Sequence, residues 1–123
     1  MMTQLLRANG ISLFLSWADL GHGDWCRLQL EVDGAVFTLG AEAKSVVFER
    51  LARALADELP ASTTKIEGIS ATWLLSLAEE HSSVFAAEIE GRRTLFFQGP
   101  DGRLLARAVL SDSERWAWMK QLQ

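Results

Sequence analysis

Residues 25–39 restrict the possible folds of this chain more than any other segment does. In residues 25–33 (WCRLQLEVD) polar and apolar side chains alternate, and a period of two is typical of a β-strand with one buried face. Asp33 and Gly34 then supply the positive φ angles that a tight type I′ turn needs. Residues 35–39 (AVFTL) are therefore expected to return as an antiparallel strand. The side chains expected to face the core are Cys26, Leu28, Leu30 and Val32.

Four further segments have the composition of strands. Each is a short, largely apolar run bounded by glycine or serine turns, and tight turns join antiparallel neighbours. The polar connection that follows Pro60 has room for one more short strand. The predicted strands cover residues 11–17, 84–90, 93–98 and 103–110, with the short one at 65–67.

Three segments are predicted to be helices. In the first, apolar residues recur at helical spacing until Pro60 ends the helix, because its ring disfavours helical geometry in the residue before it. The second begins at Ser70, a residue type that caps helices. The third begins at a capping box, in which Ser111 and Glu114 satisfy each other's backbone amides. The three helices are expected at residues 42–59, 70–81 and 112–122.

These elements predict an α+β fold with the order β-β-β-α-α-β-β-β-α. Tight turns indicate an antiparallel β-meander sheet, and three helices grouped between and after the strands indicate a layered arrangement. A length of 123 residues fits a single domain, residues 1–123. The turn sequences at residues 31–34 and 88–91 are alike. Two related hairpin-plus-helix units or the chance recurrence of common turn chemistry would each explain this.

Composition favours a globular cytoplasmic protein. Hydrophobic residues make up 49% and charged residues 23% of the chain, which is typical of a packed domain. Cys26 is the single cysteine, so no internal disulfide forms. No apolar run approaches the roughly 20 residues that cross a membrane, and the first ten residues lack the pattern of a signal peptide.

The net charge of −4 argues against a general nucleic-acid binder. The charge is uneven along the chain: residues 1–91 hold six Lys or Arg against thirteen Asp or Glu, whereas residues 92–123 hold six against three. Either the two parts attract each other within the fold, or the basic part steers a charged partner. The strand residues Arg92, Arg93, Arg103 and Arg107 surround Phe96 and Phe97, a pattern that single-strand binders use, but alternation on a solvated sheet face explains it more simply.

Asp19, His22, Asp24 and Cys26 are metal-ligand types within eight residues. Their spacing matches no zinc pattern, so an ordinary polar turn is favoured and the chain is expected to fold without metal. Cys26 as a nucleophile would need a lowered thiol pKa from a helix N-terminus or a cation. Because it is expected in mid-strand, the better interpretation is a small buried hydrophobe.

Glu79, Glu80 and His81 place carboxylates beside an imidazole, which could support acid–base chemistry. A histidine in the last turn of the second predicted helix would also complement the helix dipole, and this interpretation is favoured. The turn at residues 99–102 lacks the Lys-Ser/Thr and helix start of a phosphate loop. No cofactor and no catalytic residue is therefore predicted.

Trp116 and Trp118 are the residues that most indicate a binding role. Two positions apart on a helix, their side chains lie about 200° apart around the axis, so one flat core cannot bury both. One of the two is expected to contact a partner protein or a second copy of the chain. Arg92 and Arg93 belong to the same basic part of the sequence and are expected to contribute to that contact.

The sequence therefore favours a non-enzymatic protein-interaction module that forms a homodimer or binds another protein. Its small size, acidic charge and mixture of meander strands and helices resemble bacterial effector chaperones and toxin-immunity proteins in type. Such chaperones usually begin with a helix, whereas a strand is expected first here. The resemblance implies a bacterial chaperone, immunity or adaptor role, and the short apolar runs predict no membrane contact. The alternative is a small-molecule binder or enzyme that uses a cleft between sheet and helices.

Overall fold

A computed structural model describes residues 2–17, 24–62 and 64–122. Within them the chain forms two antiparallel sheets, a first sheet of order β1-β2-β3-β4 and a second of order β5-β6-β7-β8-β9. The first sheet consists of β1 (Met2–Ala8), β2 (Ile11–Trp17), β3 (Trp25–Val32) and β4 (Ala35–Ala43). The second consists of β5 (Thr64–Ile66), β6 (Ile69–Ser76), β7 (Ser83–Ile89), β8 (Arg92–Gln98) and β9 (Leu104–Val109).

The described residues also form α1 (Lys44–Ala52), the 3-10 turn η1 (Arg53–Leu55) and α2 (Asp112–Gln121). The α+β class is thus confirmed, but the single meander sheet with three helices is wrong. The described part contains two sheets and two α-helices, in the order β-β-β-β-α-β-β-β-β-β-α with η1 after α1. None of these helices is long and apolar enough to cross a membrane.

Four hairpins share one turn chemistry. In each, a polar residue and the glycine after it both have positive φ, which is the geometry of a type I′ turn. The values for Asp33 and Gly34 are 49° and 88°, as predicted from this Asp-Gly pair between two strand segments. The other three turns are Asn9-Gly10, Glu67-Gly68 and Glu90-Gly91.

The predicted helix over residues 70–81 is wrong, because this segment forms β6 and the turn after it. Its buried residues fall in adjacent pairs, Ala71 with Thr72 and Leu74 with Leu75, rather than at every second position. The pairing with β7 shifts register between Trp73 and Leu75, and such a bulge moves the side chains after it to the other face. Two buried pairs three residues apart resemble the i, i+3, i+4 spacing of an amphipathic helix, so the segment was predicted to be helical.

The same effect concealed β1, a strand that the alternation pattern did not predict. Leu5 and Leu6 are both buried, and the register with β2 shifts between Gln4 and Leu6. The Asn-Gly pair at residues 9–10 was the available signal, since it is the most favourable sequence for a tight hairpin turn.

The first predicted helix exists but is shorter than residues 42–59. Glu42 belongs to β4, and α1 begins at Lys44, whose amide donates to the Asp24 carbonyl over 2.8 Å. The helix ends well before Pro60, because the chain tightens into η1 and is extended again at Ala56. Glu49 and Arg53, four residues apart around the end of α1, form an exposed ion pair at 3.0 Å.

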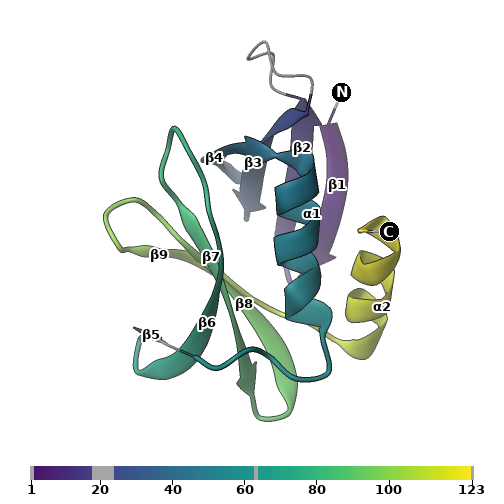
Figure 1. Cartoon of the computed structure of the whole chain (residues 1–123), viewed down its shortest axis with the longest axis vertical. Helices are drawn as coiled ribbons and strands as arrows, with labels where there is room; N and C mark the ends of the chain where they lie inside the picture. The colour runs from purple at the N-terminus through teal and green to yellow at the C-terminus, as the bar shows by residue number, and fades with distance from the viewer. Residues whose placement is uncertain (1, 18–23, 63, 123) are drawn as a thin grey trace.

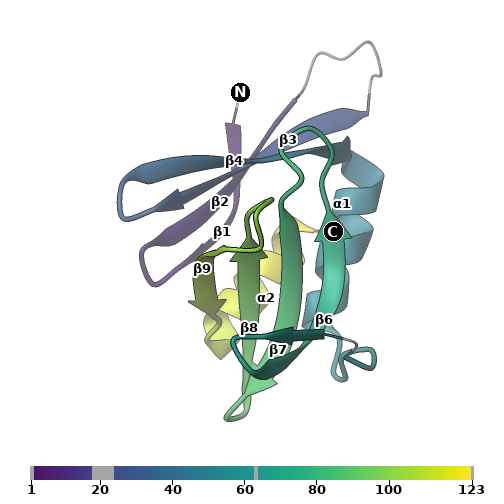
Figure 2. The same cartoon turned by 90° about the vertical axis from the view of Figure 1, so that its left-hand side faces the viewer.

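Each half of the chain is a sheet followed by a helix, and each helix contacts the sheet of the other half. The first half ends in α1, which packs on β4 and on β6, and the second ends in α2, which packs on β1. Figure 1 shows α2 beside β1, and Figure 2 shows both helices on the same side of the second sheet. One buried cluster consequently includes Leu13 of β2, Leu51 of α1, Leu95 of β8 and Trp118 of α2.

The two sheets also meet through backbone hydrogen bonds. The second half of β4 runs along the turn between β6 and β7, where Ala41 and Ala78 exchange hydrogen bonds of 3.0 and 2.9 Å. The Ser82 amide donates to the Leu39 carbonyl over 3.3 Å. The residues at the start of β4, Ala35 to Thr38, have no such cover and are exposed.

The predicted capping box at the start of α2 is confirmed. The Ser111 hydroxyl accepts from the Glu114 amide over 3.2 Å, and the Glu114 carboxylate accepts from the Ser111 amide over 2.8 Å. Replacing Ser111 by Ala is expected to lower the free energy of unfolding by about 1 kcal/mol, because one helix-end amide loses its acceptor. Urea denaturation measures this, and an unchanged midpoint would show that the cap contributes nothing to stability.

Candidate functional site

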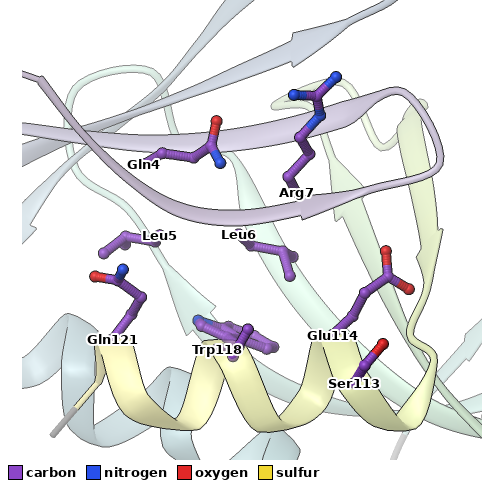
Figure 3. Close-up of a pocket in the computed structure, with 9 residues that line it drawn as sticks. Gln4, Leu5, Leu6, Arg7, Ser113, Glu114, Trp118 and Gln121 are labelled. Carbon is purple, nitrogen blue, oxygen red and sulfur yellow. The ribbon is translucent and has the colours of Figure 1, made fainter.

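Helix α2 separates its two tryptophans as the helical geometry predicts. Trp118 is 1% exposed and lies against Leu5 and Leu6 of β1, whereas Trp116 is 57% exposed. Figure 3 shows Trp118 pointing from α2 toward β1. Trp118 is therefore part of the core, and of the two tryptophans only Trp116 remains a candidate for a partner contact.

Arg92 and Arg93 also differ, since adjacent residues of a strand point to opposite faces. Arg92 is exposed, but Arg93 is 3% exposed and does not present its guanidinium at the surface. Its Nε donates to the Glu88 carboxylate over 2.7 Å, and its terminal nitrogens donate to backbone carbonyls. Those carbonyls belong to Ala54, Ala56 and Asp57. Arg93 is thus a structural residue, contrary to the expectation of a partner contact.

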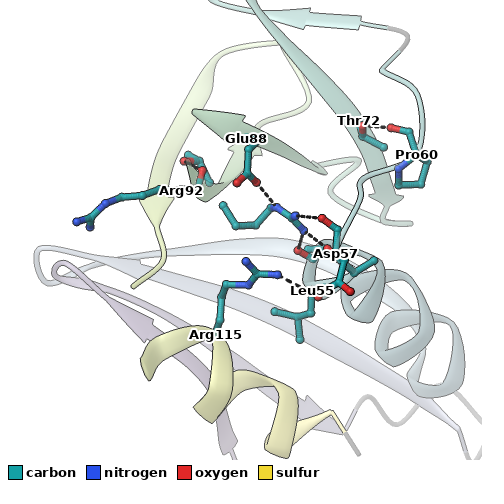
Figure 4. A network of polar contacts seen from close by, with 11 residues as sticks. Leu55, Asp57, Pro60, Thr72, Glu88, Arg92 and Arg115 are labelled. Carbon is teal, nitrogen blue, oxygen red and sulfur yellow. Dashed lines mark hydrogen bonds and ion pairs between the residues drawn. The ribbon is translucent and has the colours of Figure 1, made fainter. Parts of the chain in front are cut away.

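A second arginine completes this network (Figure 4). Arg115 of α2 donates to the Leu55 carbonyl over 3.1 Å. Together Arg93 and Arg115 bind the four successive carbonyls of residues 54–57, at the end of η1 and just after it, where no further helical turn supplies amide donors. The sequence pattern did not identify Arg115, because its partner lies 60 residues away in the chain.

Trp116 lies beside a groove between the two helices. One hollow of about 330 Å³ is lined by Leu55, Asp57, Asp112, Arg115, Trp116 and Met119. A neighbouring apolar hollow of about 310 Å³ shares Leu55 and Met119 and extends to Leu122. A third, of about 390 Å³, shares Asp112 and Arg115 and extends to Arg92. We call this continuous region, from Arg92 through Trp116 to Leu122, the Trp116 surface.

Charges of both signs surround the apolar centre of the Trp116 surface. Lys120 lies over the indole of Trp116, with its Nζ 5.2 Å from the ring centroid. The cationic residues on or beside the surface are Arg92, Arg115 and Lys120, and the anionic ones are Asp57, Glu90 and Asp112. An aromatic centre with a charged rim is the usual composition of a protein–protein contact.

Two other tryptophans are exposed, but their surroundings differ. Trp73 is 42% exposed, with the Arg50 guanidinium 5.0 Å from its ring, and its indole donates to the Ser76 hydroxyl over 2.8 Å. Trp17 is 53% exposed, with Lys44 at 5.1 Å. Neither lines the groove between the helices. Trp73 is therefore a suitable control for Trp116.

A separate apolar feature is the free start of β4. Val36 is 61% exposed and Phe37 is 36% exposed, and β4 is an edge strand of the first sheet. Ala35 to Thr38 contain no charge or proline, the devices that commonly prevent edge strands from pairing with other chains. This edge is the main competitor of the Trp116 surface as a place of self-association.

Cys26 is buried, as predicted from its place in an alternating strand. Burial raises the pKa of its thiol to about 11, and the negative charge of Asp24 acts in the same direction. The thiol is therefore protonated at neutral pH, which makes it a poor nucleophile.

The remaining candidate residues are not brought together. Asp24 accepts from the Ser45 hydroxyl over 3.2 Å near the start of α1, and Asp19 and His22 lie outside the described residues. In the described part of the chain, no group of three or more His, Cys, Asp or Glu could hold a metal. Glu79 pairs with Arg27 at 3.3 Å.

His81 does not end a helix, because its segment is a turn in which it has a φ of 57°. The helix-dipole interpretation of this residue is therefore wrong. The predicted aromatics of a nucleic-acid surface, Phe96 and Phe97, are both 0% exposed, so they cannot stack on bases.

Of the residues predicted to contact a partner, Trp116 and Arg92 are exposed. Both lie on the Trp116 surface, beside an apolar groove. Comparison of this chain with protein-family models, with curated proteins and with solved structures found no match.

Proposed function

We propose that this protein is a non-enzymatic protein-interaction module whose contact surface is the Trp116 surface and whose partner is a second copy of the chain. The observation that carries the proposal is the 57% exposure of Trp116 beside an apolar groove. Tryptophan is enriched among the residues that dominate binding energy, particularly where it fills a pocket on the partner. The Met119 and Leu122 side chains extend the apolar area beside it.

The mixed charges favour a second copy as the partner. A surface related to itself by a two-fold axis must be complementary to itself, so it needs both signs of charge. Arg92 and Lys120 of one copy can face Asp57 and Asp112 of the other, whereas a uniformly basic surface would repel its own image. An adaptor, chaperone or immunity role in the cytoplasm would be compatible with such a dimer, and the single reduced cysteine supports that compartment.

A small-molecule or enzymatic role has less support. The hollows of about 310 to 390 Å³ on the Trp116 surface are at the lower end of ligand sites. Their described lining residues contain no nucleophile placed beside a base. His81, the described histidine, does not line them.

Replacing Trp116 by Ala is expected to weaken dimerisation by at least about 30-fold, since a two-fold dimer loses the side chain from both copies. Truncating a central tryptophan typically costs about 2 kcal/mol or more of binding free energy, because the apolar contact and the exclusion of water are lost. Sedimentation equilibrium of the two chains over a range of concentrations measures the dissociation constants. The helix itself should persist, since Trp116 is exposed and makes no core contact of the kind made by Trp118.

The matched control is Trp73→Ala, which removes an exposed tryptophan of similar size from β6. Its dissociation constant should equal that of the parent chain. If both substitutions change association equally, or if the parent chain is monomeric at every concentration, the proposal is wrong.

A further inference from the structure

We propose that the groove between β1 and α2 binds an extended peptide segment of a partner protein, which adds as a further strand to the first sheet. This site goes beyond the proposed dimer, because it lies on the inward side of α2 and does not use Trp116. The groove has a volume of about 320 Å³ and contains residues of both elements along its walls. Figure 3 shows it in close-up, with β1 above and α2 below.

The first observation is an unsatisfied hydrogen-bond donor. The Nε1 of Trp118 is buried, and no described residue accepts from it. Buried polar groups in folded proteins are nearly always hydrogen-bonded, so an exception calls for a missing acceptor. In Figure 3 the nitrogen is at the end of the indole nearer Leu5 and Gln121, within the opening between β1 and α2. Gln121 is exposed, and rotation of its flexible side chain would admit an acceptor.

The second observation is the free edge of β1. This strand pairs with β2 on one side, and in the described residues no strand pairs with its other side. Every second amide and carbonyl of an edge strand points away from the sheet and can bond another extended chain. An edge strand with a helix alongside is a common way to bind a peptide, because the backbone supplies affinity and the groove supplies specificity.

These two observations identify the occupant by its chemistry. A peptide backbone provides both the donors and acceptors that the β1 edge needs and a carbonyl for the Trp118 indole. Alternate side chains of the added strand would face the groove, where Leu5, Leu6 and Ala117 favour an apolar residue. The other side chains would lie on the opposite side of β1.

On the face of β1 that points away from α2, the charge of Arg7 determines which residues of the peptide are favoured. Arg7 is exposed, points away from α2 in Figure 3 and has no ion-pair partner in the described part of the chain. The Glu114 carboxylate at the groove is already occupied by the Ser111 amide. An acidic residue of the peptide next to Arg7 would therefore be favoured. The expected ligand is an extended segment with an apolar residue facing inward and Asp or Glu facing outward.

The test is selection of a random heptapeptide library displayed on phage against the full chain, followed by titration of the recovered peptides as synthetic probes. Recovered sequences should alternate apolar and acidic residues and bind with micromolar affinity. Ala117→Trp, which fills the groove from an exposed helix position, should weaken binding at least 30-fold. Trp118→Phe, which removes the indole N–H, should weaken it about 5-fold, and Arg7→Ala should abolish the acidic preference.

In the parent chain, the Trp118 indole N–H resonance should shift downfield when peptide is added, and the β1 amides should become protected from exchange. Glu49→Trp places an indole on the outside of α1 and is the control for Ala117→Trp, with no expected effect. Trp116→Ala should leave peptide binding intact, which separates this site from the dimer surface. Recovery of no binding peptide, or binding that Ala117→Trp and Trp118→Phe leave unchanged, would overturn the proposal.

Discussion

Replacing Arg93 by Met is expected to lower the free energy of unfolding by about 3–5 kcal/mol, because several carbonyls held by one buried guanidinium lose their donor, at about 1–3 kcal/mol for each acceptor left buried. The guanidinium is almost fully buried and bonds the Glu88 carboxylate and three carbonyls at the end of α1 and η1. Methionine fills a similar volume but leaves those carbonyls without donors. Each unsatisfied buried acceptor is destabilising, so the loss exceeds that of one hydrogen bond.

Urea denaturation measures this effect, at a protein concentration low enough to keep the chain monomeric. The matched control is Arg92→Met, because Arg92 is the neighbouring residue but is exposed. Its effect should stay within about 0.5 kcal/mol, as for most surface positions. Arg93→Lys should fall between the two, since an ammonium keeps the charge but cannot reach all four oxygens. A loss below about 1 kcal/mol for Arg93→Met would contradict the structural role.

Replacing Gly40 by Ala should cost about 3 kcal/mol or more. Gly40 has a φ of 134°, a conformation that side chains rarely adopt, and forcing one into it typically costs 1–3 kcal/mol. An added Cβ would also overlap the Ala78 carbonyl and approach the Leu77 Cβ to 2.7 Å. The neighbour is backbone that is hydrogen-bonded to Ala41, so it cannot move without separating the two sheets, and overpacking adds about 1–3 kcal/mol.

Gly34→Ala isolates the conformational part of this effect. Gly34 also has a positive φ, 88°, but a Cβ there would meet no atom within 4 Å. Its substitution should cost about 1 kcal/mol, because the turn tolerates αL geometry at moderate strain. The difference between the two variants measures how tightly β4 packs on the turn after β6. Equal losses of unfolding free energy would show that the close approach of residue 40 to Leu77 and Ala78 does not contribute to the effect.

The sequence predicted elements whose signals are local. The alternation of β3, the turn at Asp33-Gly34 and the capping box at Ser111 each depend on a few adjacent residues. Prediction failed for β1 and β6, where a bulge places consecutive apolar residues on the core side. The position of such a bulge depends on pairing with the neighbouring strand. A pattern of apolar residues along one segment contains no information about that neighbour.

The same distinction applies to the candidate site. That Trp116 and Trp118 face different ways follows from helix geometry alone, but which of them is buried depends on where β1 lies. Arg93 was predicted to bind a partner because the carbonyls to which it donates, those of Ala54, Ala56 and Asp57, become its neighbours only through the fold. The groove between the helices likewise arises from segments distant in sequence.

Contact between two copies through the Trp116 surface is directly observable by isotope-filtered nuclear Overhauser spectroscopy. An equal mixture of labelled and unlabelled chain is measured above the dimer dissociation constant, and only contacts between copies give signals. If the copies meet through the Trp116 surface, signals are expected from the Trp116 ring to the partner's side chains, and none from Phe37 at the free edge of β4. Signals confined to Phe37 and its neighbours, or no signal between copies while the chain sediments at its monomer mass of 13.6 kDa, would contradict it.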